Sequence, residues 1–488
     1  MTEPSLFDPG LLLAWASTWW PAVLGTTGVL LAIAGTAHVA LTKRNVQARA
    51  GWVAILWLVP VVGALLYLLL GINRIRRRAV ALHRRLQRTA EPVVVPAAVA
   101  GMPASLRAIY RVVSQVTPRS LLPGNQVTVF DDGARAWEEM LAAIDSAQRS
   151  VTFCTYIFDY DTLGRRLVAA LSSAHARGVQ VRVLIDAVGL RYSWFNPVDR
   201  QLAEAGVPVV RFLPPRYLPW HLPYANLRNH RKILVVDGHT GFTGGMNVRD
   251  GHTRHARDPD AILDLHFALR GPVVGQLQRS FQEDWLFASG EVLAGDVWFP
   301  PLSPEGDTLA RGISDGPDED TDRLLWAYLA GIQGAQHSLY VLTPYFLPEP
   351  ELLSALNAAA MRGVDVHIVL PEHSNQPLVD WAAAGMLDEL LAHGCRVWYT
   401  PGPFDHGKLF LVDDAWSLLG SGNWDPRSLK LNFEFVVECY DPALGRRLRY
   451  LFEHRIGRAR SLSRAELRSR PFLVRLRDGL AGLLTPYL

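Results

Sequence analysis

The sequence has few cysteines and almost no excess of charge of either sign. Among its 488 residues are three cysteines, Cys154, Cys395 and Cys439, each within an apolar, β-branched or aromatic stretch and no two at the spacing of metal ligands. We therefore expect buried, reduced thiols. Lys and Arg total 49 against 46 for Asp and Glu, a formal net charge of +3. This excess is too small to indicate a general nucleic-acid-binding protein.

Charged residues are also missing from two long stretches near the N-terminus. No Asp, Glu, Lys or Arg lies between Asp8 and Lys43, nor between Arg49 and Arg74. Each stretch exceeds the roughly 20 residues that a helix needs to cross a bilayer core. We predict that residues 1–73 form two transmembrane helices joined by a short loop. A cleaved signal peptide is the alternative, but no basic segment precedes the first stretch and its apolar run is too long.

An arginine cluster follows the second stretch. Residues 74–88 contain seven arginines, and such a bias holds the adjacent helix end on the cytoplasmic side of the membrane. We therefore expect everything after residue 73 to be cytoplasmic, although Lys43, Arg44 and Arg49 in the predicted loop favour the opposite orientation. The cluster has two interpretations: it binds anionic lipid headgroups, or it only stops transfer through the membrane.

The remaining sequence contains an internal repeat. Residues 144–158 align with residues 332–346 at an offset of 188, and residues 177–181 align with residues 362–366 at an offset of 185. Both copies alternate helices and apolar strands, which predicts an α/β sandwich in each half. In the first copy the predicted elements are a helix with Trp137, Met140, Leu141 and Ile144 on one face, a strand at 151–158, a helix at 162–176 and a strand at 179–185.

The chain divides around these two copies. Residues 74–118, rich in Arg, Ala and Pro, are interpreted as a basic linker, and residues 119–299 as the first half. The second half is residues 300–460, and its segment up to residue 316 has the Pro, Gly and Asp content of a surface connection. Residues 461–488 form a basic amphipathic tail, which either lies on the membrane or packs against the folded halves.

A charged motif occurs once in each half, 176 residues apart, and both copies read H-x-K-x4-D-x6-G-x2-N. The His and Lys, two apart on an extended segment, point to the same face. Two such pairs around one phosphate suit in-line displacement, in which one His attacks, the other protonates the leaving alkoxide, and Lys and Asn stabilise the oxygens. No metal or other cofactor is required. The residues are His230, Lys232, Asp237 and Asn247 in the first copy, and His406, Lys408, Asp413 and Asn423 in the second.

The paired motifs resemble those of the phospholipase D superfamily, and the similarity covers about residues 120–460. The resemblance implies a duplicated phospholipase D-type α/β/α sandwich after the N-terminal transmembrane hairpin. It further implies that His230 is the nucleophile and that His406 is the general acid and later the base. For Asp237 and Asp413 it implies supporting hydrogen bonds.

The superfamily also uses an acidic residue after each motif to orient and charge its histidine. Asp264 and Glu434 match those positions, so the resemblance implies that each supports the histidine of its own motif. Asp250, Asp258 and Asp260 are alternatives to Asp264, because they lie close to it in the sequence.

Several stretches resemble the bacterial cardiolipin synthases in particular. Two positions depart from their pattern: Gly245 stands where the second motif has Ser421, and Trp424 replaces a smaller apolar residue. We expect both departures to lie beside the phosphate and to affect headgroup choice. The similar stretches are residues 70–74, 314–317, 343–346, 420–428 and 432–434.

This resemblance implies a membrane phosphatidyltransferase of the bacterial inner (cytoplasmic) membrane. It would convert two phosphatidylglycerols to cardiolipin and glycerol through a phosphohistidine, with phosphatidylethanolamine as another candidate substrate. Three alternatives stay open: a phospholipase D that hydrolyses or exchanges headgroups, a noncatalytic membrane scaffold, and a nuclease, against which the two spans argue. The acceptor lipid and the oligomeric state do not follow from the sequence.

Two weaker features remain. The aromatic- and proline-rich residues 212–224 are either an active-site loop or a segment that dips into the membrane. His221, His239, His252 and His255 lack the spacing of zinc ligands, and we expect them on the surface.

Overall fold

The computed structural model has two compact units, one of residues 1–75 with 215–226, and one formed by the rest of the chain. The arginine cluster at 74–88, His221 and the loop residues 215–224 lie outside the described residues. The structure describes residues 9–43, 46–71, 95–190, 197–214, 227–317 and 322–485.

The N-terminal unit contains one long helix and a broken second segment. Helix α1 (Pro9–Thr42) includes Trp19–Thr42, which among the described residues is the one helix long and apolar enough to cross a membrane. The second stretch is divided into α2 (Val46–Leu58), α3 (Pro60–Leu66) and the π-helix η1 (Tyr67–Gly71). Pro60 has no N–H to continue the ladder, so it begins a new helix. The first predicted span is therefore confirmed as a helix, whereas the second is not one continuous helix.

Helix α1 packs along this broken segment. A Cβ on Gly35 would lie 2.9 Å from the Leu56 side chain, so glycine permits close approach there. His38 Nδ1 and Tyr67 Oη are 2.7 Å apart. Within this unit, the two stretches are therefore held side by side by apolar packing and a polar contact.

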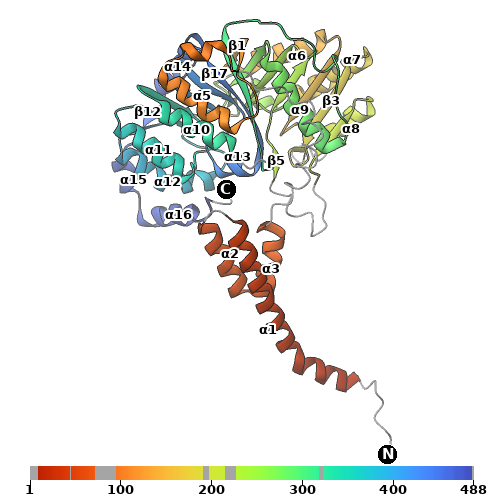
Figure 1. The fold of residues 1–488 in the computed structure, drawn as a ribbon, viewed down its shortest axis with the longest axis vertical. Coiled ribbons are helices and arrows are strands. Elements are labelled where there is room, and N and C mark those ends of the chain that lie inside the picture. The colour runs from red at the N-terminus through yellow and green to blue at the C-terminus, as the bar shows by residue number, and fades with distance from the viewer. Residues whose placement is uncertain are drawn as a thin grey trace, which may run out of the picture. The chain divides into compact units, whose positions relative to one another are not determined.

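The second unit is built on one continuous sheet with a repeated strand order (Figure 1). At its centre β1 (Leu122–Phe130) pairs antiparallel with β10 (Thr308–Asp315), one strand from each half. Outward from β1 the order is β9 (His266–Arg270), β7 (Thr240–Gly244), β6 (Ile233–Val236), β2 (Ser150–Thr155), β3 (Gln180–Asp186) and β4 (Val209–Phe212). Outward from β10 it is β17 (Asn432–Tyr440), β16 (Trp416–Gly420), β15 (Leu409–Val412), β11 (Ser338–Leu342), β12 (Asp365–Pro371), β13 (Arg396–Thr400) and β18 (Arg460–Ser461).

Helices cover both faces of the first half's sheet. Successive side chains of β2 point to opposite faces. Phe153 therefore packs in a hydrophobic cluster with the helices on one face of the sheet, which we call the first face. The Thr152 hydroxyl points to the other face and donates to Gln278 of the helix there at 2.8 Å. The first-face helices are α6 (Gly133–Ser146), α7 (Thr162–Ala176) and α8 (Val198–Glu204), and the opposite helix is α9 (Val273–Ser289).

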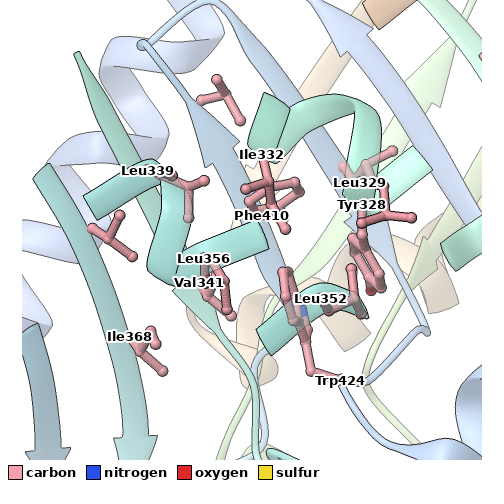
Figure 2. Close-up of a cluster of buried hydrophobic side chains, with 14 of the residues drawn as sticks. Tyr328, Leu329, Ile332, Leu339, Val341, Leu352, Leu356, Ile368, Phe410 and Trp424 are labelled. Atoms are coloured by element: carbon pink, nitrogen blue, oxygen red, sulfur yellow. The ribbon is translucent and has the colours of Figure 1, made fainter. Parts of the chain in front are cut away.

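The second half repeats this arrangement. Leu339 and Val341 of β11 pack in the cluster drawn in Figure 2, whereas Tyr340 between them lies against Phe452 of the opposite helix, with ring centroids 5.2 Å apart. The predicted duplicated α/β/α sandwich is therefore confirmed. The first-face helices here are α10 (Arg323–Gly334), α11 (Pro350–Met361) and α12 (Pro377–Ala392), and the opposite helix is α14 (Pro442–Ile456).

The predicted elements of the first copy appear close to their expected bounds. The four apolar side chains predicted on one face of α6 are all at least 94 % buried, since their exposed fractions reach 6 % at most. The helix predicted at 162–176 is α7. Gly178 and Gly363, which follow α7 and α11, have φ of +91° and +93°. Such left-handed backbone ends a helix and favours glycine.

Two predicted connecting segments contain core elements instead. Residues 74–118 were assigned to a linker, but Ala104–Val116 form helix α5, whose Ile109 and Val113 are buried against the second half. This helix packs in the core because one of its faces is apolar, although the surrounding sequence is basic. Likewise, the segment 300–316 includes the central strand β10, which is buried because both neighbouring strands pair with it.

The C-terminal tail is folded. It forms α15 (Arg464–Ser469) and α16 (Phe472–Gly482), and α16 packs on α12, where the Arg477 guanidinium lies 4.3 Å from the Trp381 ring centroid. Several large apolar side chains remain exposed on its other side, namely Phe472, Leu473, Leu476, Leu480 and Leu483.

Candidate active site

The two motif histidines each directly follow a short strand that pairs with a strand of the other half. Strand β5 (Arg228–Asn229) of the first half pairs with the start of β17, and His230 N donates to Phe433 O at 3.0 Å. Strand β14 (Phe404–Asp405) of the second half pairs with β8 (Ile262–Leu263), and His406 N donates to Leu263 O at 2.7 Å. Each histidine is thereby held beside the acidic residue of the opposite half.

The side chains follow this crossed pairing. His230 Nδ1 is 3.0 Å from Glu434 Oε1, and His406 Nδ1 is 2.7 Å from Asp264 Oδ2. The expectation that each acid supports the histidine of its own motif is therefore wrong. Because Nδ1 of both rings is engaged by a carboxylate, Nε2 is the nitrogen left for attack or proton transfer. Asp250, Asp258 and Asp260 are not the partners of either ring.

The two motif lysines are buried next to their histidines. Lys232 Nζ donates to His230 O at 2.7 Å, and Lys408 Nζ donates to His406 O. Burial lowers the pKa of Lys232 to about 7 and that of Lys408 to about 8, because the charged ammonium loses its hydration. A bound phosphate would restore the charged form of both lysines, so the pair is suited to an anion.

Burial also lowers the pKa of both motif imidazoles. It lowers the pKa of His230 despite the opposing charge of Glu434. Burial and then the positive charge of Lys408 bring the pKa of His406 well below its usual value. Both rings are therefore neutral without an anion, which a nucleophile requires. A general acid must be protonated, and a phosphate anion beside His406 would raise its pKa.

Glu434 is held ionised by a set of donors. Its carboxylate accepts from Ser428 Oγ at 2.6 Å and Asn432 Nδ2 at 3.3 Å, and also from Ser421 Oγ. Burial alone would raise the pKa of Glu434, but its interaction with His230, the charge of Lys232 and the hydrogen bond from Ser421 outweigh burial, and the pKa lies below its usual value.

Asp264 has a different setting, which explains the departure at Gly245. A Cβ on Gly245 would lie 2.1 Å from Asp264 Oδ1, so no side chain fits beneath this carboxylate. The serine at the equivalent position, Ser421, instead donates to the longer Glu434. The two halves therefore hold their carboxylates in different ways. The contact with Asp264 explains the glycine at position 245, and the choice of headgroup is not needed to explain it.

His252 is a site residue that the sequence interpretation missed. It is 3 % exposed and lines the site, so its predicted surface position is wrong, whereas His239 and His255 are exposed as predicted. His252 Nε2 accepts from Asn247 N at 3.3 Å, as Ser428 Oγ accepts from Asn423 N at 2.9 Å. The motif offset of 176 pairs His252 with Ser428 and would have indicated this position. Burial lowers the pKa of His252 to about 3.

The motif aspartates lie outside the pocket. Asp237 accepts from Arg149 N at 2.7 Å and Ser150 N at 2.9 Å, just before β2. Asp413 accepts from His337 N at 2.8 Å and Ser338 N at 2.9 Å, just before β11. Their contacts are structural, because they satisfy backbone N–H groups where a helix gives way to a strand.

Trp424 is the other departure from the family pattern. It is 1 % exposed, and its ring stacks on Tyr328 with centroids 4.4 Å apart (Figure 2). It therefore fills the core of the second half, and its expected effect on headgroup choice is not supported by its contacts.

A cavity of about 330 Å³ joins the site residues of both halves. Both histidines line it, with Asn247 and Asn423 beside them. Tyr156 and Tyr345 each lie edge-on to one histidine, with ring centroids 5.4 Å from His230 and 6.1 Å from His406 respectively. Among the other lining residues, Asp425 and Arg427 lie in the stretch 420–428 that resembles cardiolipin synthases. The sequence analysis did not single out Arg228, Arg249, Asn375 and Gln376.

Comparisons with known proteins agree with the duplicated fold. The family model described as "Cardiolipin synthase, PLD-like domain" matches residues 140–285 and 328–456, one copy in each half. The chain belongs to this family. The model "Phospholipase_D-nuclease N-terminal" matches residues 30–71 in the N-terminal unit of this family member.

Relatives cover nearly the whole length of this cardiolipin synthase family member. A cardiolipin synthase of Geobacillus kaustophilus (strain HTA426) is 32 % identical over 98 % of this chain and 97 % of its own. The major cardiolipin synthase ClsA of Bacillus subtilis (strain 168) is 31 % identical over 91 % of this chain and 95 % of its own. Among solved structures, phosphatidylserine synthase of Haemophilus influenzae Rd KW20 is similar in fold, with a TM-score of 0.59 and 14 % identity over 79 % of this chain and 100 % of that one.

Proposed function

We propose that this protein transfers a phosphatidyl group from one phosphatidylglycerol to a hydroxyl of a second, which gives cardiolipin and releases glycerol. The observation that supports this most is the pair of buried histidines in one cavity, each bonded to a carboxylate of the other half. The names of the relatives support the same lipid product.

The reaction follows as two displacements at phosphorus. His230 Nε2 attacks the phosphodiester while His406 gives its proton to the leaving glycerol oxygen, and a phosphohistidine forms. A hydroxyl of the second phosphatidylglycerol then loses its proton to His406 and attacks phosphorus, which breaks the N–P bond. Lys232 and Lys408 neutralise the nonbridging oxygens, and the side-chain amide of Asn247 donates to them.

The rival functions differ in what reaches the intermediate. Water in place of the second lipid would make the protein a phospholipase D, and phosphatidylethanolamine could replace one phosphatidylglycerol. A noncatalytic scaffold would have no use for two intact histidine and lysine pairs. We expect the lipid acceptor to dominate, because an apolar helix long enough to span a membrane precedes the catalytic unit.

Product analysis tests this function directly. The purified full-length protein, given labelled phosphatidylglycerol, should form cardiolipin and glycerol in equal amounts. The same assay with added phosphatidylethanolamine will show whether that lipid is also used. Phosphatidic acid as the main product would instead identify a hydrolase, and no product at all would favour the scaffold.

The membrane topology is part of the same proposal. We place the protein in the bacterial inner membrane with two passes and the catalytic unit in the cytoplasm, because basic residues cluster after residue 73. The three native cysteines are buried, so introduced cysteines report accessibility. In intact spheroplasts, an impermeant thiol reagent should label Thr42→Cys, and it should label the exposed Met361→Cys only after lysis. Labelling of Met361→Cys before lysis would reverse the orientation.

A further inference from the structure

The two walls of the cavity differ in charge at equivalent positions. The motif offset of 176 pairs Arg249 of the first half with Asp425 of the second, and both line the cavity. Arg228 lines the same wall, and each arginine has an acid beside it: Arg249 Nε lies 2.6 Å from Asp159 Oδ2, and Arg228 Nη1 lies 3.8 Å from Asp186 Oδ1. On the second wall Asp425 is 5 % exposed, and the cations Arg427 and Lys408 partly offset its charge. The duplicated fold therefore carries side chains of opposite charge at equivalent positions of its site.

The second wall also presents hydrogen-bond acceptors. Asn432 Nδ2 donates to Glu434, and since a carboxylate only accepts, this bond sets the orientation of the amide. Asn432 Oδ1 is buried without a hydrogen-bond partner among the described residues, and so is Asn423 Oδ1. In the first half the corresponding oxygen, Asn247 Oδ1, already accepts from Ile157 N at 3.2 Å.

A donor lies at the rim of the same wall. Tyr345 Oη donates to Asn375 Oδ1 at 2.6 Å, which leaves the NH₂ group of this exposed amide for a ligand. The second wall thus combines buried acceptors with a donor. A phosphodiester has acceptors alone, so its oxygens would be repelled by Asp425 and would leave the amide oxygens unpaired. A hydroxyl both donates and accepts, and it satisfies both kinds of group.

We infer that the wall formed by Asn375, Asn423, Asp425 and Asn432 binds the hydroxyl groups of a polyol, here the glycerol headgroup, whereas Arg228 and Arg249 face the phosphate. This inference rests on the proposed function and adds the side on which the headgroup lies. His406 belongs to the same half, so the polyol lies beside the group that protonates its leaving oxygen. The leaving glycerol and the attacking headgroup would then use one subsite in turn.

An alcohol competition measures this preference in a single tube. The full-length protein in phosphatidylglycerol vesicles is given equal concentrations of labelled glycerol and 1-propanol, and the two phosphatidyl products are quantified. The wild type should favour glycerol by about tenfold or more, because sites built to bind a hydroxyl discriminate against analogues that lack it. Asp425→Asn should reduce this ratio by about tenfold, since it removes a charged acceptor, while an asparagine still caps helix α13 (Pro426–Lys430).

Two further variants control the experiment. Arg249→Gln should lower both products together and leave their ratio unchanged, because both alcohols react with the same phosphate. Asn375→Asp exchanges the rim donor of an exposed residue for a negatively charged acceptor, so the fold should survive, and we expect a smaller fall in the ratio. An unchanged ratio in both Asp425→Asn and Asn375→Asp would overturn the inference, as would loss of both products in both variants. If the wild type forms neither of these products nor cardiolipin, the proposed function itself fails, whereas cardiolipin without a preference for glycerol would overturn only this inference.

Discussion

His230→Asn should abolish both lipid turnover and labelling of the protein by substrate, whereas His406→Asn should abolish turnover of phosphatidylglycerol but still permit phosphorylation of His230. Attack and protonation take place on opposite sides of phosphorus, so only one ring can carry the phosphoryl group in a given substrate pose. Each single variant should lose about 10⁴-fold or more in kcat, and the double variant should be no worse, because the two rings act as a unit.

A leaving group that needs no proton separates the two roles. With a p-nitrophenyl phosphatidyl ester, His406→Asn should release one burst of p-nitrophenol and form a stable adduct, whereas His230→Asn should give neither. The labelled peptide can be mapped by mass spectrometry under conditions that preserve phosphohistidine. Phosphate on His406 and none on His230 would reverse the assignment, and substantial turnover by either variant would refute the two-histidine mechanism.

The crossed carboxylates lead to a second large effect. Glu434→Gln should slow phosphorylation of His230 although the two residues belong to different halves, because the amide cannot stabilise the imidazolium that develops on attack. Asp264→Asn should leave the p-nitrophenol burst unchanged. It should slow the reaction with phosphatidylglycerol, because the amide no longer supports proton transfer by His406. Loss of a carboxylate that orients and charges a catalytic histidine costs on the order of 10⁴-fold in other enzymes.

Burst kinetics with the same p-nitrophenyl ester distinguish the two pairings. If each acid supported the histidine of its own motif, Asp264→Asn would lose the burst and Glu434→Gln would keep it. Asp260→Asn is a matched control near Asp264, because its side chain is 79 % exposed and outside the cavity. It should change neither the burst nor lipid turnover.

The sequence by itself determined the repeat, most elements of its first copy and the paired motifs that supply the candidate catalytic side chains. Helix α7 and the buried face of α6 follow from hydrophobic periodicity, and the motif spacing of 176 identified His230 and His406 as an equivalent pair. These features are local, or they recur at a constant offset, so they can be detected without knowing which strands meet in space. Even His252 was detectable through its offset partner Ser428, although the absence of zinc-ligand spacing led to the prediction of a surface position.

Only the tertiary structure decided which groups meet. Strands β5 and β14 each pair with a strand of the other half, and this pairing gives Glu434 to His230 and Asp264 to His406. Local periodicity reports which face of a strand is buried but not its partner across more than 140 residues of chain. For the same reason the sequence did not show that α5 packs in the second half, nor that Asp425 and Arg249 face one cavity with opposite charge. The repeat made the halves equivalent in pattern, and long-range packing made them chemically different.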